Sequence, residues 1–357
     1  MTVSFLALAM GLVGLVWSAD RFVHGAASLA HNLGMSTFII GLTIVALGTS
    51  APEILVSVMA ALDNVPGLAI GNAIGSNIAN VGLVLGVTAL ITNLHVQKQV
   101  IKEDLPIALL VSLIVVALLY DRELSRSDGV LLLTTLGFYL IFLIRYKAGK
   151  NKHKIQVDDV NSKDYASVKE SLGENIERAQ SILEVEEELE EEFTEPTLTT
   201  SQAVYTFIIG LIILLMSAKI LVWGSENIAH HFGISDTLIG LTLVAVGTSL
   251  PELAASISSA LKGHQDIAIA NVIGSNIYNM LTVLPVPALM APSHLEASVW
   301  SRDVLVMVGL SVLLFLMVFV GKKQTLTWPK GLILLCLYVG YYIVLYQQGI
   351  DFSTPQA

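Results

Sequence analysis

Two glutamates, Glu53 and Glu252, lie in apolar stretches of the sequence, and each directly follows a proline. The residues before them are Gly-Thr-Ser-Ala-Pro in the first case and Gly-Thr-Ser-Leu-Pro in the second. A carboxylate is costly to bury among apolar residues, so its presence there indicates a functional role. A proline inside a helix lacks an N–H and displaces the carbonyl one turn earlier, which frees a backbone oxygen for a cation.

A hydroxyl side chain stands one helical turn before each glutamate. Thr49 precedes Glu53 by four positions, and Thr248 precedes Glu252 by the same spacing, so each pair is expected to share a helix face. One turn would then supply a carboxylate, a hydroxyl and backbone carbonyls. These hard oxygen ligands suit Na⁺ and Ca²⁺ better than thiophilic metals. The motif therefore predicts a site for a hard cation.

A neutral polar stripe follows each of these motifs at a spacing of four residues. We interpret both stripes as facing inward and coordinating cations, with interhelical hydrogen bonding as the alternative. Small residues beside them, Gly71 with Gly75 and Ala270 with Gly274, predict a face for close helix packing. The stripes consist of Asn72, Ser76 and Asn80, and of Asn271, Ser275 and Asn279.

The two motifs belong to an internal repeat. Gly41–Asn80 aligns without gaps to Gly240–Asn279, with 22 identities in 40 positions and a constant offset of 199. Bias toward Leu, Ala and Val would not reproduce Thr-Ser-x-Pro-Glu twice. The chain therefore consists of two related halves.

The composition indicates that both halves lie in a membrane. Of 357 residues, 54% are hydrophobic and 13% charged, and the mean hydropathy is +0.73, whereas soluble domains are about 25% charged. We expect an all-α integral membrane protein, because backbone groups in lipid must be paired internally. Ten transmembrane helices are predicted at about 3–33, 37–62, 67–92, 104–120, 128–146, 202–232, 236–261, 267–291, 303–320 and 328–347.

Five spans in each half make the second half enter the membrane inverted relative to the first. Inverted repeats with matching interrupted helices are typical of alternating-access transporters with a site near the membrane midplane. We divide the chain into a five-helix repeat at 1–146, an acidic loop at 147–200 and an inverted five-helix repeat at 201–357. The loop carries seven basic and fourteen acidic residues. Lys and Arg number twelve on one predicted face and four on the other, which predicts a cell-membrane (inner or plasma membrane) protein with both termini outside and a cytoplasmic loop.

The motif pairs Gly-Thr-Ser-Ala-Pro-Glu with Gly-Ser-Asn-Ile-Ala-Asn, and Gly-Thr-Ser-Leu-Pro-Glu with Gly-Ser-Asn-Ile-Tyr-Asn, resemble the two repeats of the Ca²⁺/cation antiporter superfamily. Within it the chain is similar to prokaryotic sodium/calcium exchangers. The resemblance implies antiport of Ca²⁺ against Na⁺ without a cofactor, with the first and sixth helices sliding past a fixed core. The ligands it implies are Thr49, Ser50, Glu53, Ser76 and Asn80, then Thr248, Ser249, Glu252, Ser275 and Asn279, and the carbonyls of Ala46 and Ala245.

One residue departs from that resemblance. Many relatives have Asp where this chain has Asn279, so only two carboxylates remain in the expected site. This difference bears on whether a third Na⁺ binds and on whether a proton takes part in the exchange.

Two rival transport activities remain open from the sequence. A Ca²⁺/H⁺ antiporter is the first, because a desolvated glutamate can cycle protons. A cation channel is the second. An enzyme is not expected, since there is no nucleotide-binding glycine loop and neither Ser50 nor Ser249 has a basic partner nearby. The few, scattered basic residues also speak against nucleic-acid binding.

Overall fold

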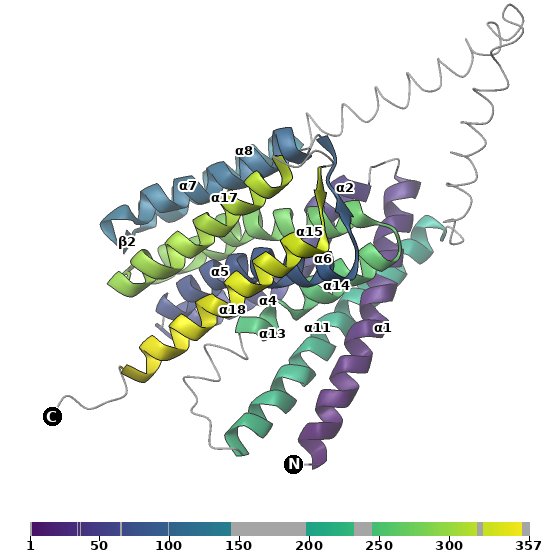
Figure 1. Cartoon of the computed structure of the whole chain (residues 1–357), viewed down its shortest axis with the longest axis horizontal. Helices are drawn as coiled ribbons and strands as arrows, with labels where there is room; N and C mark the ends of the chain where they lie inside the picture. Colours follow the sequence, from purple (N-terminus) through teal and green to yellow (C-terminus); the bar gives the residue numbers. More distant parts are fainter. Residues whose placement is uncertain are drawn as a thin grey trace, which may run out of the picture.

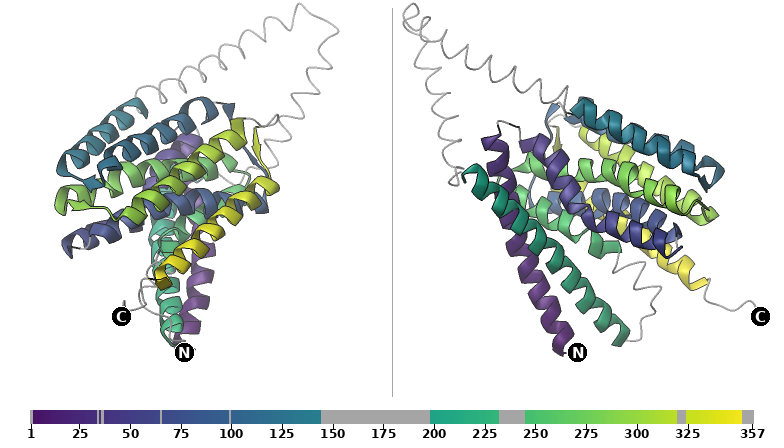
Figure 2. Two further views of the ribbon diagram at one scale, coloured as in Figure 1. Left: turned by 60° about the vertical axis from the view of Figure 1, so that its left-hand side comes forward. Right: turned by 180° about the vertical axis from the view of Figure 1, so that it is seen from behind.

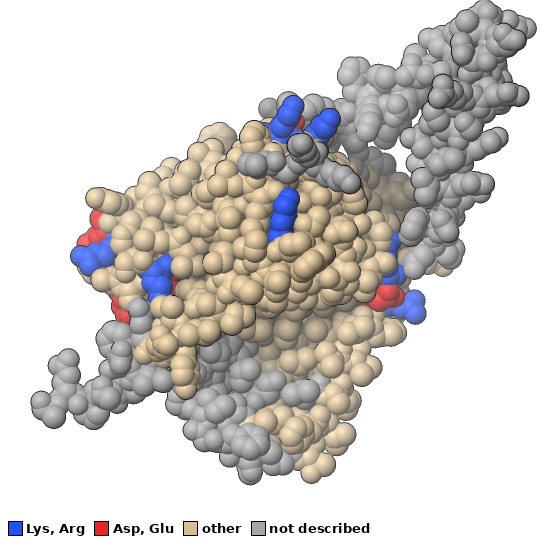
Figure 3. All heavy atoms as spheres, in the orientation of Figure 1, with Lys and Arg blue, Asp and Glu red and all other residues tan. Residues whose placement is uncertain are grey.

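The computed structural model describes residues 2–143 apart from 34, 36, 65 and 99, together with 198–231, 245–319 and 324–351. It is an all-helical membrane protein, as predicted (Figure 1). Within the described residues, eight helical segments are long and apolar enough to cross a bilayer. Charged side chains are few on the face shown in Figure 3, where a broad surface without Lys, Arg, Asp or Glu lies between them. The eight segments are Thr2–Asn32, Thr37–Leu62, Pro66–Ile91, Val100–Asp121, Thr200–Gly224, Gln265–Met290, Val299–Phe319 and Trp328–Gln347.

The other two predicted spans are described in part. The span predicted at 128–146 contains α8 (Arg126–Phe142), which begins with a capping box between Ser125 and Asp128. The span predicted at 236–261 contains α13 (Ala245–Thr248) and α14 (Leu250–Leu261), and its first residues lie outside the described part. The predicted loop at 147–200 also lies outside it, except for its last three residues.

The first half begins with one long helix and continues with interrupted ones. The interruptions are π-helical turns, labelled η, which are rare and often occur at functional sites. The elements are α1 (Thr2–Asn32), α2 (Thr37–Ile40), η1 (Gly41–Val45), α3 (Ala46–Thr49), α4 (Ala51–Leu62), α5 (Pro66–Ala79), η2 (Asn80–Leu85), α6 (Gly86–Ile91), η3 (Val100–Asp104), α7 (Leu105–Leu118), a 3₁₀ turn η4 (Leu119–Asp121) and α8.

The second half repeats this order. Two of its π turns, η7 and η8, begin 199 residues after η2 and η3, so the duplication extends to the irregular turns. Besides α13 and α14, its helices are α11 (Thr200–His231), α15 (Gln265–Tyr278), η7 (Asn279–Val283), α16 (Pro285–Met290), η8 (Val299–Val304), α17 (Leu305–Phe319) and α18 (Trp328–Asp351).

The fourth and ninth helices begin about one turn before the predicted starts at 104 and 303. Charged residues such as Arg302 and Asp303 break the apolar pattern there, but they fold into the first turn of each helix. Asp303 is buried and accepts hydrogen bonds from the Arg302 guanidinium at 2.6 and 3.0 Å and from the Tyr341 hydroxyl at 3.0 Å. Because the charge is paired, the helix can begin inside the protein.

Two short antiparallel ribbons join the halves. Strand β1 (Leu94–His95) pairs with β4 (Thr325–Leu326), and β2 (Glu123–Leu124) pairs with β3 (Ser293–His294). Strands β1 and β3 lie 199 residues apart, so the ribbons are equivalent features of the two repeats. Each ribbon holds a loop of one half beside a loop of the other.

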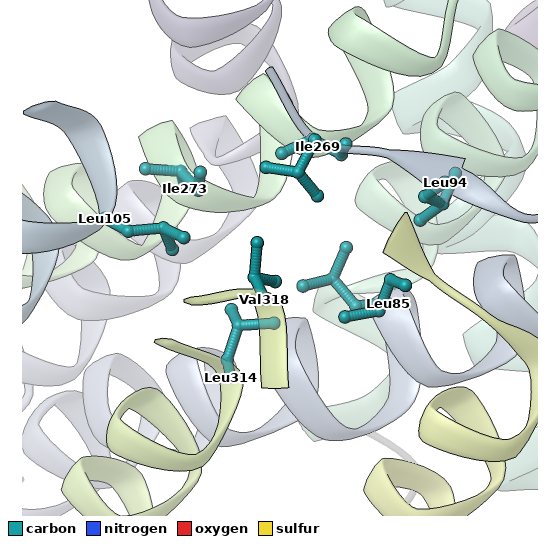
Figure 4. Close-up of a pocket in the computed structure, with 9 residues that line it drawn as sticks. Leu85, Leu94, Leu105, Ile269, Ile273, Leu314 and Val318 are labelled. Atoms are coloured by element: carbon teal, nitrogen blue, oxygen red, sulfur yellow. The ribbon is translucent and has the colours of Figure 1, made fainter. Parts of the chain in front are cut away.

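An apolar cavity of about 10 Å³ lies beneath the β1–β4 ribbon (Figure 4). A cavity of this size without polar groups stays dry, so it is part of the packed core rather than a site for ions. Its lining consists of Leu85, Leu94, Val96, Leu105, Ile269, Ile273, Leu314, Val318 and Leu326.

Helices α1 and α11 cross closely and run obliquely to the other helices (Figures 1 and 2). A Cβ at Gly11 would lie 2.8 Å from Leu221, and a Cβ at Gly210 would lie 2.6 Å from the backbone of Phe22. The Phe22 ring also stacks on Phe207, with ring centres 4.8 Å apart. This close contact makes α1 and α11 one packed unit.

Candidate cation site

Both glutamates lie in the first turn of a new helix. Helix α3 ends at Thr49 and α4 begins at Ala51, because Ser50 has a ψ of 6°. The second repeat breaks in the same way at Ser249, with a ψ of 3°. Each of these spans is thus interrupted at the serine that precedes the proline motif, in line with the predicted interrupted helices. Each proline lies in a first turn, where its missing N–H costs nothing, and each carboxylate lies at a helix N-terminus, which favours negative charge.

The break also changes which hydroxyl lies beside which carboxylate. Thr49 was expected beside Glu53, but its hydroxyl lies beside Glu252 of the other repeat. In the same way, Thr248 lies beside Glu53. Each glutamate is therefore approached by a threonine from the opposite repeat.

Further oxygens surround each carboxylate. The Ser50 hydroxyl donates a hydrogen bond of 3.2 Å to Glu252 Oε1, and Ser275 lies beside the same carboxylate. Ser76 lies beside Glu53. Glu53 and Glu252 are fully buried and close enough to interact electrostatically. The two motifs thus form one site.

A backbone carbonyl predicted as a ligand also faces this region. The Ala46 carbonyl accepts a hydrogen bond of 3.4 Å from the Ser275 hydroxyl of the other repeat and one of 3.3 Å from Thr49. Ala245 begins α13 at the position equivalent to Ala46.

Several buried oxygens and amides of this site make no hydrogen bond within the described protein. Buried polar atoms nearly always have a partner, so a cluster of exceptions requires an explanation. A dehydrated cation would satisfy the oxygens and would offset the two buried charges. The atoms are both carboxylate oxygens of Glu53, Oε2 of Glu252, the hydroxyls of Ser76 and Ser249, and the side-chain amides of Asn80 and Asn279.

The structure therefore brings the predicted side chains together in one buried region. No group of three or more His, Cys, Asp or Glu side chains occurs in the described ranges, so the negative charge here comes from two carboxylates. The predicted side chains that are nearly or fully buried are Thr49, Ser50, Glu53, Ser76, Asn80, Thr248, Ser249, Glu252, Ser275 and Asn279.

The first asparagine of each polar stripe has a structural partner. The Asn72 amide donates to the Glu53 carbonyl at 3.0 Å, and the Asn271 amide donates to the Glu252 carbonyl at 3.4 Å. Asn271 also accepts a hydrogen bond of 3.1 Å from Thr49. For these two residues the structure favours interhelical hydrogen bonding, the alternative to cation coordination.

One contact between the repeats involves a residue that sequence reasoning did not select. The Asn77 amide donates to the Asn276 carbonyl at 3.2 Å, which joins α5 to α15. Both asparagines belong to the repeated Gly-Ser-Asn triplet, so identity between the repeats was the available signal.

The small residues of the second repeat pack closely against the first. A Cβ at Gly274 would lie 2.6 Å from the Leu42 carbonyl and 2.7 Å from Ala46, as the predicted close packing requires. A Cβ at Gly71 or Gly75 would meet no atom within 4 Å in the described chain.

Comparison with known proteins adds an independent line of argument. The family model described as sodium/calcium exchanger protein matches residues 3–145 and 202–347. A protein named putative antiporter CaxA from Alkalimonas amylolytica is 42% identical over 97% of this chain and 99% of its own. Inner membrane protein YrbG of Escherichia coli strain K12 is 37% identical over 89% of both chains.

A solved structure gives the same likeness in three dimensions. It is the sodium-calcium exchanger NCX_Mj soaked with 10 mM Na⁺ and 10 mM Sr²⁺. It superposes with a TM-score of 0.73 at 31% identity and covers 100% of this chain and 99% of its own.

Proposed function

Because this chain belongs to the sodium/calcium exchanger family, and is thus a multi-pass cation antiporter rather than an enzyme, we propose that it exchanges Ca²⁺ for Na⁺ by alternating access. The observation that carries the proposal is the pairing of two buried carboxylates, Glu53 and Glu252, each beside hydroxyls of the opposite repeat. Ca²⁺ takes six to eight oxygen ligands, and it gains from two negative charges.

We propose that both ions use one set of oxygens. Na⁺ accepts the same hard ligands, so the two ions compete, and this competition couples their fluxes. Since the ligands come from both repeats, a movement that separates the repeats on one side would open the site to that side. The proposed ligands are the side chains of Thr49, Ser50, Glu53, Ser76, Asn80, Thr248, Ser249, Glu252, Ser275 and Asn279, with the carbonyls of Ala46 and Ala245.

A flux assay tests this function. The full chain is reconstituted into vesicles, and ⁴⁵Ca²⁺ uptake is measured with Na⁺, K⁺ and H⁺ gradients imposed separately. We expect an outward Na⁺ gradient to drive Ca²⁺ uptake and a pH gradient alone not to. Uptake driven by the pH gradient alone would instead identify a Ca²⁺/H⁺ antiporter, and single-channel currents would identify a channel.

We propose that the protein resides in the cell membrane with both termini outside and the 147–200 loop in the cytoplasm. The pairing of β1 with β4 and of β2 with β3 supports an inverted arrangement of the repeats. In a Cys336→Ala background, Asn161→Cys is expected to escape an impermeant thiol reagent in intact cells and to react after permeabilisation. Asp121→Cys, on the proposed outer side, is the positive control. Labelling of Asn161→Cys in intact cells would show that the topology is the opposite of the one proposed.

The asparagines that brace the site are expected to differ in importance. Asn271→Ala should raise the Ca²⁺ concentration for half-maximal exchange by about three- to tenfold, because Thr49 loses the acceptor that orients its hydroxyl. Asn72→Ala is the matched control, since it also loses a bond to a glutamate carbonyl, and we expect a smaller change. Initial rates of ⁴⁵Ca²⁺ uptake at a series of Ca²⁺ concentrations measure both effects. A larger effect at Asn72 would contradict this role for Asn271.

A further inference from the structure

Four charged residues occupy equivalent places in the two repeats with their charges exchanged. Asp20 of α1 corresponds to Lys219 of α11, each pair of positions being 199 apart. Asp63 directly follows α4, and its equivalent, Lys262, directly follows α14. An acid on α1 can therefore meet a base at the end of α14, and a base on α11 can meet an acid at the end of α4.

One of these two ion pairs is formed. The Lys262 ammonium lies 2.9 Å from Asp20 Oδ1, and the lysine side chain is only 16% exposed. Asp63 and Lys219 are both exposed, and no ion pair joins them in the part of the chain that the structure describes.

Local helix chemistry explains the charge of Lys262 but not that of Asp63. Both residues end a helix, and both are followed by a residue with positive φ, 56° at Asn64 and 79° at Gly263. A helix C-terminus favours a positive charge and disfavours a negative one. Asp63 is therefore unfavourable for α4 unless a cation approaches it.

Helix packing, like ion pairing, is present at the Lys262 end and weaker at the Asp63 end. At the Lys262 end, α1 packs along α14. Among the described elements, α11 has no packing on α4 comparable to that of α1 on α14.

We propose that the two pairs are alternating latches for the α1–α11 unit. Asp20–Lys262 holds the present conformation, in which α1 packs along α14. In the opposite conformation that pair separates, and Lys219–Asp63 forms at the other end. Because α1 and α11 are packed through glycine contacts, the two helices move together, and one latch opens as the other closes. The alternation rests on the proposed exchange function, but it can be measured without any ion flux.

Distances between spin labels at the two ends provide the test. Two labelled forms of the full chain are prepared in a Cys336→Ala background, since Cys336 is exposed and free. One carries Trp17→Cys with Leu261→Cys, and the other Met216→Cys with Leu62→Cys. All four positions are exposed, and the two label pairs are equivalent under the 199-residue offset. Distance distributions are recorded in lipid nanodiscs without an ion gradient.

Neutralising the two ion pairs one at a time should shift the populations of the two conformations in opposite directions. Lys262→Gln is expected to favour the form with a short 62–216 distance and a long 17–261 distance by about two- to fivefold, the size expected for a partly exposed ion pair. Asp20→Asn should give the same shift, which guards against misfolding of one variant. Lys219→Gln should shift the ratio the other way by a similar factor.

The charge-reversed combination Asp20→Lys with Lys262→Asp should return the ratio to that of the parent. Shifts in the same direction for Lys262→Gln and Lys219→Gln, or no shift in either, would overturn the latch. If the parent chain showed no Na⁺-driven ⁴⁵Ca²⁺ uptake, the exchange function would be refuted. The distances between the labels would still test the latch.

Discussion

Glu53→Gln is expected to abolish Ca²⁺ transport while the protein still folds into the membrane. The amide keeps the size of the side chain and one acceptor oxygen, but it removes half of the negative charge in a fully buried site. Losing one partner of a buried charge interaction costs about 3–5 kcal/mol. We therefore expect ⁴⁵Ca²⁺ flux to fall by at least about 100-fold.

Two measurements distinguish loss of the cation site from misfolding of the variant. Ser57→Ala is the matched control, because Ser57 is also buried on α4 one turn beyond Glu53 but donates to the Ala69 carbonyl. That variant should retain most of its flux. Thermal unfolding in detergent should show stabilisation by Ca²⁺ for the parent and for Ser57→Ala but not for Glu53→Gln. Near-normal flux in Glu53→Gln would show that the site assignment is wrong.

The positions of the site residues could be predicted from the repeat, but their pairing could not. Spacing of four residues placed Thr49 on the same helix face as Glu53, on the assumption of one continuous helix. In the structure the helix is interrupted at Ser50, and the Thr49 hydroxyl lies beside Glu252 of the other repeat. A one-residue break depends on what packs against it, and sequence periodicity does not contain that information.

The same limit explains the role of the asparagine stripes. A spacing of four residues correctly predicted that one helix face is polar and buried. It could not separate Asn72, which holds the Glu53 carbonyl, from Asn80, whose amide has no partner in the described protein.

The eight spans of the described residues could be predicted because apolar length is a local property. The starts of the fourth and ninth helices could not, since Asp303 is tolerated inside the protein only through Arg302 and Tyr341. The ribbons that join the halves are two residues long. Strands this short leave no alternation to detect.

Asn279→Asp is expected to change the coupling of transport rather than destroy it. The new carboxylate would lie on the stripe of Ser275, in a site that already holds Glu53 and Glu252, and the Asn279 amide it replaces is fully buried without a partner in the described chain. Three carboxylates at short range cannot all remain ionised unless another cation joins them. The added group should therefore bind a proton or recruit a further Na⁺.

Either result has a measurable signature in vesicle flux. A proton makes exchange more pH-dependent between about pH 6 and 9. A further Na⁺ raises the Hill slope for Na⁺ by up to about one, because one more ion then binds in each cycle. Asn279→Ala is the control, because it removes the amide without adding charge; it should weaken ion binding but leave the pH profile as in the parent. If Asn279→Asp kept its flux with both quantities unchanged, its side chain would not face the ions. The charge of the site would then be set by Glu53 and Glu252 alone.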